Sequence, residues 1–236
     1  MAQKCEMKLL GSVGSSFVNR VKFTLKLKSI EYDYIEEDLN ANKSELLLES
    51  NPVFQRVPVL FPPNEPPVTE SLVIMEYLDE LQPDIHPLLP SNPSERAQCR
   101  VLAYTFDTLY YPWMKEFMLT RDKERKEELG KLIIEGSMIL EEAFVKFSKG
   151  KAYFGGDDIG YLDIVVGVFL GWMKLFEVVL GFNVIEEVRT PKLIEWGNRM
   201  WSHEVAGSII PGHEIHMNFL NMLKGKLPPL PVPVSV

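Results

Sequence analysis

The sequence predicts an α/β domain followed by an all-helical domain. Three observations support this fold class. Short β-rich runs alternate with helical periods over residues 1–82, where they end in a β-hairpin and a helix. A stretch with prolines at positions 83, 87, 90 and 93 indicates a linker over 83–93. Over residues 94–225 the periodic segments are helical, and a proline-rich segment, expected to be extended, follows at 226–236.

The predicted elements of the first domain follow the order β-α-β-α-β-β-α. They are a strand over 7–11, a helix over 17–27, a strand over 31–35, a helix over 43–48, hairpin strands at 57–61 and 68–69, and a helix over 71–81. The first helix is indicated by apolar residues at 17/18, 21 and 25 with basic residues between them. Pro58 stands near the start of the third strand, and this order with that proline is typical of a thioredoxin-like unit.

The segment around Pro58 offers several groups to a small ligand. X–Pro bonds readily become cis, and a cis Val57–Pro58 bond leaves the Val57 backbone free to pair with a peptide-like ligand as an added strand. Glu70 can hold an amine. Ser71 lies at or near the start of a helix, where free N–H groups attract an anion, and Arg56 adds a cation. This combination suits a small zwitterionic peptide.

The second domain is predicted to hold helices over 94–111, 122–147, 162–180, 191–201 and 214–223. Pro112 is expected to kink or end the first of these helices. The segment 162–180 is apolar nearly all round, so we expect it to be the buried central helix and not a membrane span. Thr190 and Pro191 indicate an N-cap followed by proline at the first helical position.

Two polar motifs in this domain have structural interpretations. Asp163 lies near the start of the central helix, and we expect it to be a folding cap and not a catalytic acid. Because Gly160 occupies the cap position, the capping box is one-sided. His213 and His216 lie three residues apart without further ligand candidates, so surface histidines are expected and no metal site.

Composition limits the partners and the compartment. The 236 residues are 46% hydrophobic and 25% charged, which is ordinary for a globular protein with a sizeable core. A net charge of −8 argues against nucleic acid or an anionic membrane as the main partner. The N-terminus lacks an apolar secretory stretch, and Cys5 and Cys99 show neither metal-ligand nor CxxC spacing. We therefore expect a cytoplasmic protein with reduced thiols.

A set of motifs occurs in order over nearly the whole chain and resembles the tau class of plant glutathione S-transferases. The motifs are Gly11-x-x-x-Ser15-x-Phe17-Val18-x-Arg20-Val21, Asn42-Lys43-Ser44-Glu45, Ser50-Asn51-Pro52-Val53, Val57-Pro58-Val59-Leu60, Glu70-Ser71-Leu72, and Gly155-Gly156-Asp157 to Asp163-Ile164. The resemblance implies conjugation of glutathione, as co-substrate, to small hydrophobic electrophiles in detoxification and stress responses, without a bound cofactor. It also allows a side activity as glutathione peroxidase. It further implies a homodimer, for which Phe54, apolar and on a loop, is a candidate contact unless it packs within its own subunit.

The resemblance assigns the catalytic role to Ser15 and glutathione binding to a set of positions: Lys43, Arg56, Val57, Glu70 and Ser71. Arg56 replaces the lysine usual in the family, and a guanidinium can still bind a carboxylate with two hydrogen bonds. The chain departs from the family at Ser16, where proline is usual, and at Val13, where an aromatic residue is usual. These departures allow a looser loop and a wider pocket. Two adjacent serines leave open which hydroxyl faces the thiol, and the position relative to Gly11 favours Ser15.

Conjugation requires glutathione as the thiolate. A free thiol has a pKa near 8.5, so only about 3% is ionised at pH 7. Lowering that pKa by about two units takes roughly 2.7 kcal/mol of preferential thiolate stabilisation. A serine hydroxyl that donates to the sulfur at a helix N-terminus can supply this without acting as a base. Taken alone, Ser15 is better explained as a helix cap, and the accompanying motifs favour the catalytic role.

Aromatic residues are core residues by default, but a few are expected to line an apolar electrophile pocket facing Ser15. The candidates are Phe17, Tyr110, Tyr111, Trp113 and Trp172. An alternative function is a carrier of glutathione or hydrophobic ligands with little turnover, which the altered loop at Val13 and Ser16 would favour. A thiol-disulfide exchanger of the same fold requires cysteine in place of Ser15, and Cys5 lies too early in the chain to serve.

Overall fold

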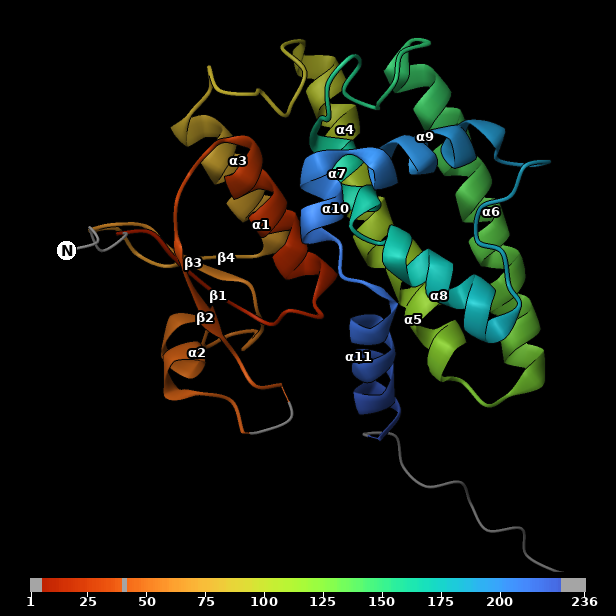
Figure 1. Ribbon diagram of the computed structural model, residues 1–236, viewed down its shortest axis with the longest axis horizontal. Coiled ribbons are helices and arrows are strands. Elements are labelled where there is room, and N and C mark those ends of the chain that lie inside the picture. The colour runs from red at the N-terminus through yellow and green to blue at the C-terminus, as the bar shows by residue number, and fades with distance from the viewer. Residues whose placement is uncertain (1–5, 40–41, 226–236) are drawn as a thin grey trace, which may run out of the picture.

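A four-stranded mixed sheet forms the centre of the N-terminal domain in the computed structural model, which describes residues 6–39 and 42–225 (Figure 1). The strand order is β2-β1-β3-β4. Strand β1 runs parallel to β2 and antiparallel to β3, and β3 pairs antiparallel with β4. The strands are β1 (Lys8–Gly11), β2 (Asp33–Glu36), β3 (Val59–Phe61) and β4 (Val68–Thr69).

Helices cover both faces of this sheet. They are α1 (Ser16–Leu27), α2 (Glu45–Ser50) and α3 (Ser71–Leu81). Successive residues of a strand point to opposite faces. Leu9 therefore packs with the core of α1 and α3, whereas Leu10 packs against Leu47 of α2. The predicted order β-α-β-α-β-β-α is confirmed. The alternation of side chains along each strand determines which helix covers which face of the sheet.

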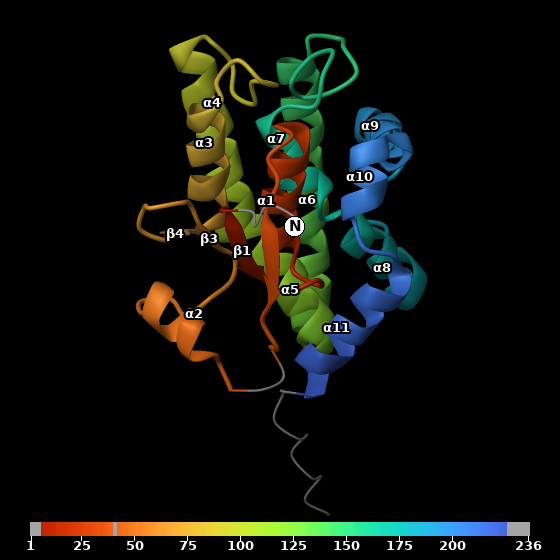
Figure 2. The ribbon, with the colours of Figure 1, turned by 60° about the vertical axis from the view of Figure 1, so that its left-hand side comes forward.

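The C-terminal domain is helical and lies beside α1 and α3 (Figures 1 and 2). Its elements are α4 (Pro93–Thr105), the π-helix η1 (Phe106–Tyr110), α5 (Tyr111–Leu119), α6 (Lys123–Ser148), α7 (Tyr161–Gly167), α8 (Leu170–Leu180), α9 (Pro191–Ser202), α10 (Glu204–Ile209) and α11 (His213–Gly225). Its core also takes in Phe23 of α1 and Met75 of α3, so the two domains share a packed interface. The short helix α10 was not predicted from the sequence.

The first helix of this domain begins one residue earlier and ends later than predicted. Pro93 is its first residue, and the Asn92 side chain accepts from the N–H groups of Ser94 and Glu95, so the linker ends at residue 92. The chain stays helical through Pro112, because the wider turn of η1, closed by the Tyr111 N–H to the Phe106 carbonyl, precedes it. A π-helical turn accommodates a residue that lacks an N–H without ending the helix.

The prediction of one central helix over 162–180 is wrong, because a two-residue turn separates α7 from α8. The Phe169 N–H bonds to the Val166 carbonyl at 3.0 Å, an i−3 pattern that breaks the α-helical ladder. All of α7 is buried, whereas Val178 and Val179 near the end of α8 are exposed. In an amphipathic segment, a break between two helices appears in the sequence as a shift in the positions of the polar residues. The segment 162–180 is apolar nearly all round, so its sequence carries no such signal.

Asp163 is the fold's buried cap, as predicted. Its carboxylate is fully buried and accepts from the backbone N–H groups of Phe154, Gly155 and Gly160, each at 2.9 Å, and from the indole N–H of Trp196 at 2.7 Å. Gly160 is the N-cap residue and has no side chain, so the box is one-sided. The carboxylate thereby ties the loop before α7 to α9.

Helix α9 starts at Pro191 as predicted, but its cap comes from another helix. Thr190 is the N-cap residue, yet its hydroxyl exchanges hydrogen bonds with the Glu186 backbone. The Glu141 carboxylate of α6 instead accepts from the N–H groups of Lys192 and Leu193, each at 2.8 Å. Tertiary contact thus replaces the local cap.

The expectation of surface histidines is wrong for His216, whose ring is buried against Trp172 with ring centroids 4.9 Å apart. The His213 side chain, Cys5 and the segment 226–236 lie outside the described residues. Within the described ranges, no group of three or more His, Cys, Asp and Glu side chains could hold a metal ion. Nor does any helix there have the length and apolar character that crossing a membrane requires.

Candidate active site

Ser15 lies where the loop after β1 turns into α1. Its backbone is extended (φ −85°, ψ 115°), and it is the N-cap residue of α1. The Ser15 Oγ accepts from the Val18 N–H at 3.4 Å. Because a hydroxyl has one hydrogen and two lone pairs, this contact leaves the hydroxyl hydrogen for another acceptor. The capping role and donation to an anion at the helix N-terminus are therefore compatible.

Ser16 is placed differently. It is the first residue of α1, it is buried, and its Oγ donates to the Val168 carbonyl at 3.5 Å in the turn between α7 and α8. That contact occupies its single hydrogen with a backbone acceptor. The geometry favours Ser15 as the hydroxyl that faces a thiol.

A small pocket opens beside Ser15 between the two domains, with an open volume of about 50 Å³. It is lined by Gly14, Ser15, Ser16, Phe17, Tyr111, Met114, Lys115, Met118, Phe169, Trp172 and Phe219. The rings of Phe17, Tyr111 and Phe169 contact one another with centroids 4.9 to 5.7 Å apart. Ligand pockets for drug-sized molecules usually hold about 300 Å³ or more, so a substrate must displace some of these side chains.

Helix α11 forms one wall of this pocket. Figures 1 and 2 show α11 beside α5 and α8. Phe219 packs on Trp172 with ring centroids 5.8 Å apart. A Cβ added to Gly14 would come within 2.5 Å of the Phe219 ring, so only glycine allows this close approach of loop and helix. No local pattern in the sequence pairs residue 14 with residue 219.

Three of the five aromatic candidates line the pocket: Phe17, Tyr111 and Trp172. The other two, Tyr110 and Trp113, do not line it and lie on the side of the helix that faces α6. The Tyr110 hydroxyl lies 2.7 Å from the Ser137 Oγ, and a Cβ added to Gly136 of α6 would meet both rings.

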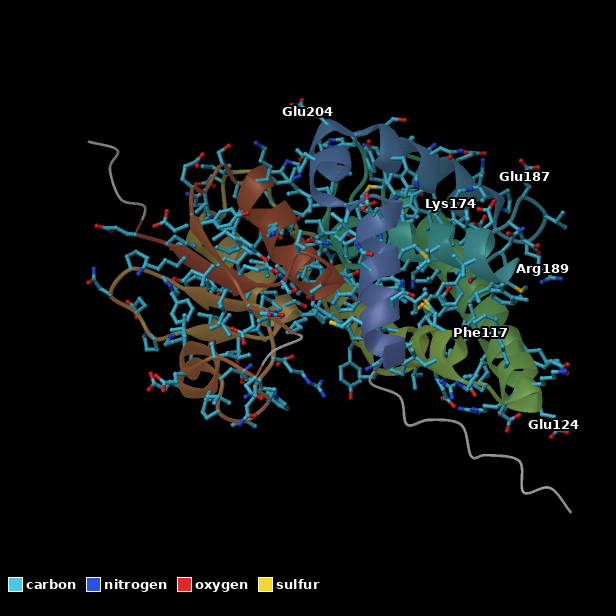
Figure 3. The ribbon with its side chains drawn as sticks, turned by 60° about the horizontal axis from the view of Figure 1, so that its bottom comes forward. Phe117, Glu124, Lys174, Glu187, Arg189 and Glu204 are labelled. Atoms are coloured by element: carbon cyan, nitrogen blue, oxygen red, sulfur yellow. The ribbon has the colours of Figure 1, made fainter. Side chains whose placement is uncertain are left out.

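The next aromatic residue of α5, Phe117, also lies away from the pocket. It packs against Phe176 and Phe182. Figure 3 labels Phe117 within the helical domain. The lining residues of α5 instead recur at i, i+3, i+4 and i+7, namely Tyr111, Met114, Lys115 and Met118. That spacing is visible in the sequence, but several faces of this aromatic helix are apolar, and only packing shows which one faces Ser15.

The proposed glutathione positions lie around the β3–β4 hairpin. The Val57–Pro58 bond is cis, as predicted. Strand pairing aligns Val59 with Thr69, so the chain before Pro58 and the start of α3 at Ser71 lie at the same end of the β3–β4 pair. Glu70 is the N-cap residue of α3 at φ +68° and is exposed, whereas Ser71 is buried. The hairpin therefore sets a strand-like backbone beside a helix N-terminus.

Ser71 is held by a buried arginine. Arg20 donates to the Ser71 Oγ at 3.2 Å and to both carboxylate oxygens of Asp107 in η1, at 2.8 and 2.7 Å. It also donates to the Val165 carbonyl of α7. Because the Ser71 Oγ accepts from Arg20, its own hydrogen remains to be donated to an anion. This cluster connects α1, α3, η1 and α7.

Lys43 and Arg56 are exposed. The Lys43 ammonium donates to the Gln55 side chain at 3.2 Å, which brings it next to Arg56 in the chain. Burial raises the pKa of the Tyr111 hydroxyl, and the charge of Arg56 counteracts that rise, so Arg56 lies near enough to the pocket to act on Tyr111. The contact with Gln55 thus places two exposed basic residues together just before the hairpin.

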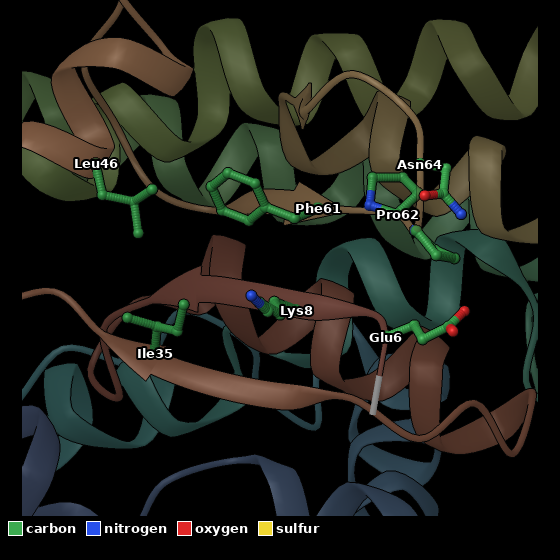
Figure 4. A pocket seen from close by; sticks show the side chains of 8 residues that line it. Glu6, Lys8, Ile35, Leu46, Phe61, Pro62 and Asn64 are labelled. Atoms are coloured by element: carbon green, nitrogen blue, oxygen red, sulfur yellow. The ribbon is translucent and has the colours of Figure 1, made fainter. Parts of the chain in front are cut away.

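Another cavity among the described residues, of about 570 Å³, is much larger than the pocket beside Ser15. It lies on the sheet face beside α2, lined by Glu6, Lys8, Ile35, Leu46, Phe61, Pro62, Pro63 and Asn64 (Figure 4). Lys8 begins β1, whereas Ser15 follows the opposite end of that strand. Size alone does not identify the site, because this cavity contains none of the proposed catalytic or glutathione-binding residues.

Comparisons with known proteins agree with this geometry. Residues 5–80 match the glutathione S-transferase N-terminal domain. The chain is 41% identical to glutathione S-transferase U15 of Arabidopsis thaliana over 212 residues, which covers 89% of this chain and 91% of that protein. It is 40% identical to glutathione S-transferase U16 of the same plant over 225 residues, covering 95% and 96%.

Two solved structures are also similar. A tau-class glutathione S-transferase from mango, Mangifera indica, superposes with a TM-score of 0.88 at 38% identity, covering 94% of this chain and 100% of that one. A rice glutathione S-transferase solved in complex with glutathione superposes with a TM-score of 0.82 at 32% identity, covering 94% and 99%. The similarity therefore extends over both domains.

Proposed function

This chain belongs to the tau class of plant glutathione S-transferases, and we propose that it conjugates glutathione to small hydrophobic electrophiles. The observation that carries the proposal is the Ser15 hydroxyl at the N-terminus of α1, with a free hydrogen and an apolar pocket beside it. Donation from Ser15 stabilises the thiolate. The thiolate attacks the electrophilic carbon, a C–S bond forms, a leaving group such as chloride departs with its electron pair, and the thiol proton passes to solvent.

The hairpin and α3 supply the binding groups for glutathione. In the proposed pose the Val57 backbone pairs with the peptide, Glu70 holds the α-amino group, and Ser71 with the α3 N-terminus holds the adjacent carboxylate. Arg56 and Lys43 hold the carboxylate at the other end. The register of β3 and β4 and the Arg20–Ser71 contact support this assignment.

Initial rates with chlorodinitrobenzene and glutathione test the proposed function. Saturable turnover above the uncatalysed rate is expected. The alternative, a glutathione or hydrophobic-ligand carrier, predicts saturable glutathione binding by calorimetry without turnover. Glutathione binding without turnover would show that the protein is a carrier and not an enzyme. Organic hydroperoxides in the same assay test a glutathione peroxidase side activity, which would use the same thiolate.

Replacing Glu70 by glutamine is expected to weaken glutathione binding. The substitution removes a charged partner of the α-amino group, and because Glu70 is exposed in the free protein the loss should be about 1–2 kcal/mol. Isothermal titration calorimetry measures it directly. Glu65→Gln, on the exposed hairpin turn, is the matched control and should change nothing. Unchanged glutathione affinity in Glu70→Gln would show that the amine lies elsewhere.

We also propose that the protein is a homodimer, with one subunit's N-terminal domain on the other's helical domain. Phe54 is 55% exposed within the subunit, beside the still more exposed Val53. Val101 and Tyr104 of α4 are exposed apolar residues of the helical domain. Buried free Cys99 is consistent with a reducing compartment, and we propose the cytoplasm.

Phe54→Ser is expected to convert the dimer to a monomer at micromolar concentration, because a buried aromatic anchor contributes a large share of interface energy. Light scattering should give twice 27.0 kDa for the wild type and 27.0 kDa for the variant. Val188→Ser, at another exposed apolar position, is the control and should stay dimeric. A wild-type mass of 27.0 kDa contradicts the dimer.

A further inference from the structure

We infer that the pocket beside Ser15 prefers electrophiles that carry a negatively charged group next to an apolar body, with Lys115 as the residue that contacts that group. The inference rests on the proposed function and names its substrate class. Among the described residues that line the pocket, Lys115 is the one that carries a charge, and the others are apolar, aromatic, glycine or serine. A single cation in an apolar lining selects for a matching anion.

The α5 residues that line the pocket include a buried apolar part and an exposed edge, and Lys115 lies at the exposed edge. Met114 and Met118 on the same face of α5 are buried, at 2% and 9% exposure, whereas Lys115 is exposed. An aromatic or alkyl body on the two methionines and the rings of Phe17 and Phe169 therefore places a charged substituent at the Lys115 end. Because Lys115 is exposed, water screens its charge in part, and the expected selectivity is modest.

Neighbouring carboxylates do not neutralise Lys115. Glu116, the next residue, makes paired hydrogen bonds with Arg125 of α6 at 2.7 and 2.8 Å. Asp107, which lies two turns earlier, is paired with Arg20. Within the described ranges, no carboxylate oxygen lies within 4.0 Å of the Lys115 ammonium. Its charge therefore remains available to a ligand.

Glutathione does not need this cation in the proposed pose. Its carboxylates are assigned to Ser71 with the α3 N-terminus and to Arg56 with Lys43, all around the hairpin. Lys115 comes from α5 in the other domain. The two substrates would thus be recognised by separate cations, and their contributions can be measured separately.

A pair of acceptors that differ in charge tests the inference: neutral chlorodinitrobenzene and anionic chlorodinitrobenzoate. For Lys115→Gln, kcat/KM for the benzoate should fall roughly three- to tenfold, while kcat/KM for the neutral acceptor and KM for glutathione stay unchanged. Comparing variants with the same acceptor cancels the intrinsic reactivity of the two compounds. Lys115→Arg should restore the rate, and added salt should lower the wild-type benzoate rate selectively.

Lys131→Gln, an exposed α6 lysine that does not line the pocket, is the charge-matched control and should leave both rates unchanged. Equal losses with both acceptors in Lys115→Gln would show a structural role and overturn the inference. A raised KM for glutathione with both acceptors would also overturn it, because the cation would then serve glutathione. Wild-type protein without turnover of either acceptor would instead contradict the proposed function.

Discussion

Ser15→Ala is expected to lower turnover about 10- to 1000-fold at pH 6.5 while leaving glutathione affinity nearly intact. The reason is geometric: the Ser15 Oγ lies at the start of α1 beside the electrophile pocket, whereas the residues proposed to bind glutathione lie around the hairpin. Without the hydrogen bond from Ser15, only the N-terminus of α1 still stabilises the thiolate. Steady-state kinetics with calorimetry of glutathione binding separates the rate effect from the affinity effect.

The pH–rate profile identifies the serine. In Ser15→Ala the kinetic pKa of the bound thiol should rise toward 8.5, the value of a free thiol. Ser16→Ala is the matched control, because the Ser16 hydroxyl donates to the Val168 carbonyl and should affect packing more than thiol ionisation. Because Ser15 also caps α1, its loss should cost about 1 kcal/mol of stability, so rates must be compared below the unfolding transition. If Ser16→Ala abolishes activity and Ser15→Ala keeps the wild-type profile, the role belongs to Ser16.

Asp163→Ala is expected to reduce the free energy of unfolding by about 4 kcal/mol or more, since each buried donor left without a partner costs about 1–3 kcal/mol. Four donors converge on this one carboxylate. Asp163→Asn should cost less, because an amide oxygen can still serve Phe154 and Trp196 in place of Oδ1, whereas the NH₂ group would face the N–H groups of Gly155 and Gly160. Denaturant titration measures both, and Asp158→Asn, an exposed neighbour, should change little.

The pH dependence of stability in the wild type and in Asp163→Asn tests whether burial raises the pKa of Asp163. Burial raises the pKa of Asp163 to about 6 from 3.8, against the four donors that favour its charge. A raised carboxyl pKa means that the folded state holds a proton that the unfolded state has released. The contribution of this group to stability is therefore full below about pH 4 and lost as pH rises through about 6. Asparagine does not titrate, so the stability difference between the wild type and Asp163→Asn should narrow over that interval. A difference that widened would contradict the raised pKa.

Local sequence patterns determined most of the elements and several site residues. The strands around Leu9 and Leu60, the helix periods of α1 and α6, and the capping position of Asp163 depend on neighbours a few residues apart, so they are visible without a structure. The Val57–Pro58 bond, found cis, follows the known tendency of X–Pro bonds next to a hairpin. The proposed roles of Ser15, Glu70 and Ser71 came from family motifs, and Arg20 of α1 connects the helix that Ser15 caps to Ser71 at the start of α3.

Tertiary packing decided what depends on residues distant in the chain. The break between α7 and α8 and the burial of His216 depend on contacts with other helices. A segment that is apolar nearly all round carries no sequence signal for either feature. Packing also selected the face of α5 that carries Met114 and Lys115 toward Ser15, and directed Tyr110 toward α6. A helix with several apolar faces has several nearly equivalent orientations, and only the contacts of the whole fold distinguish among them.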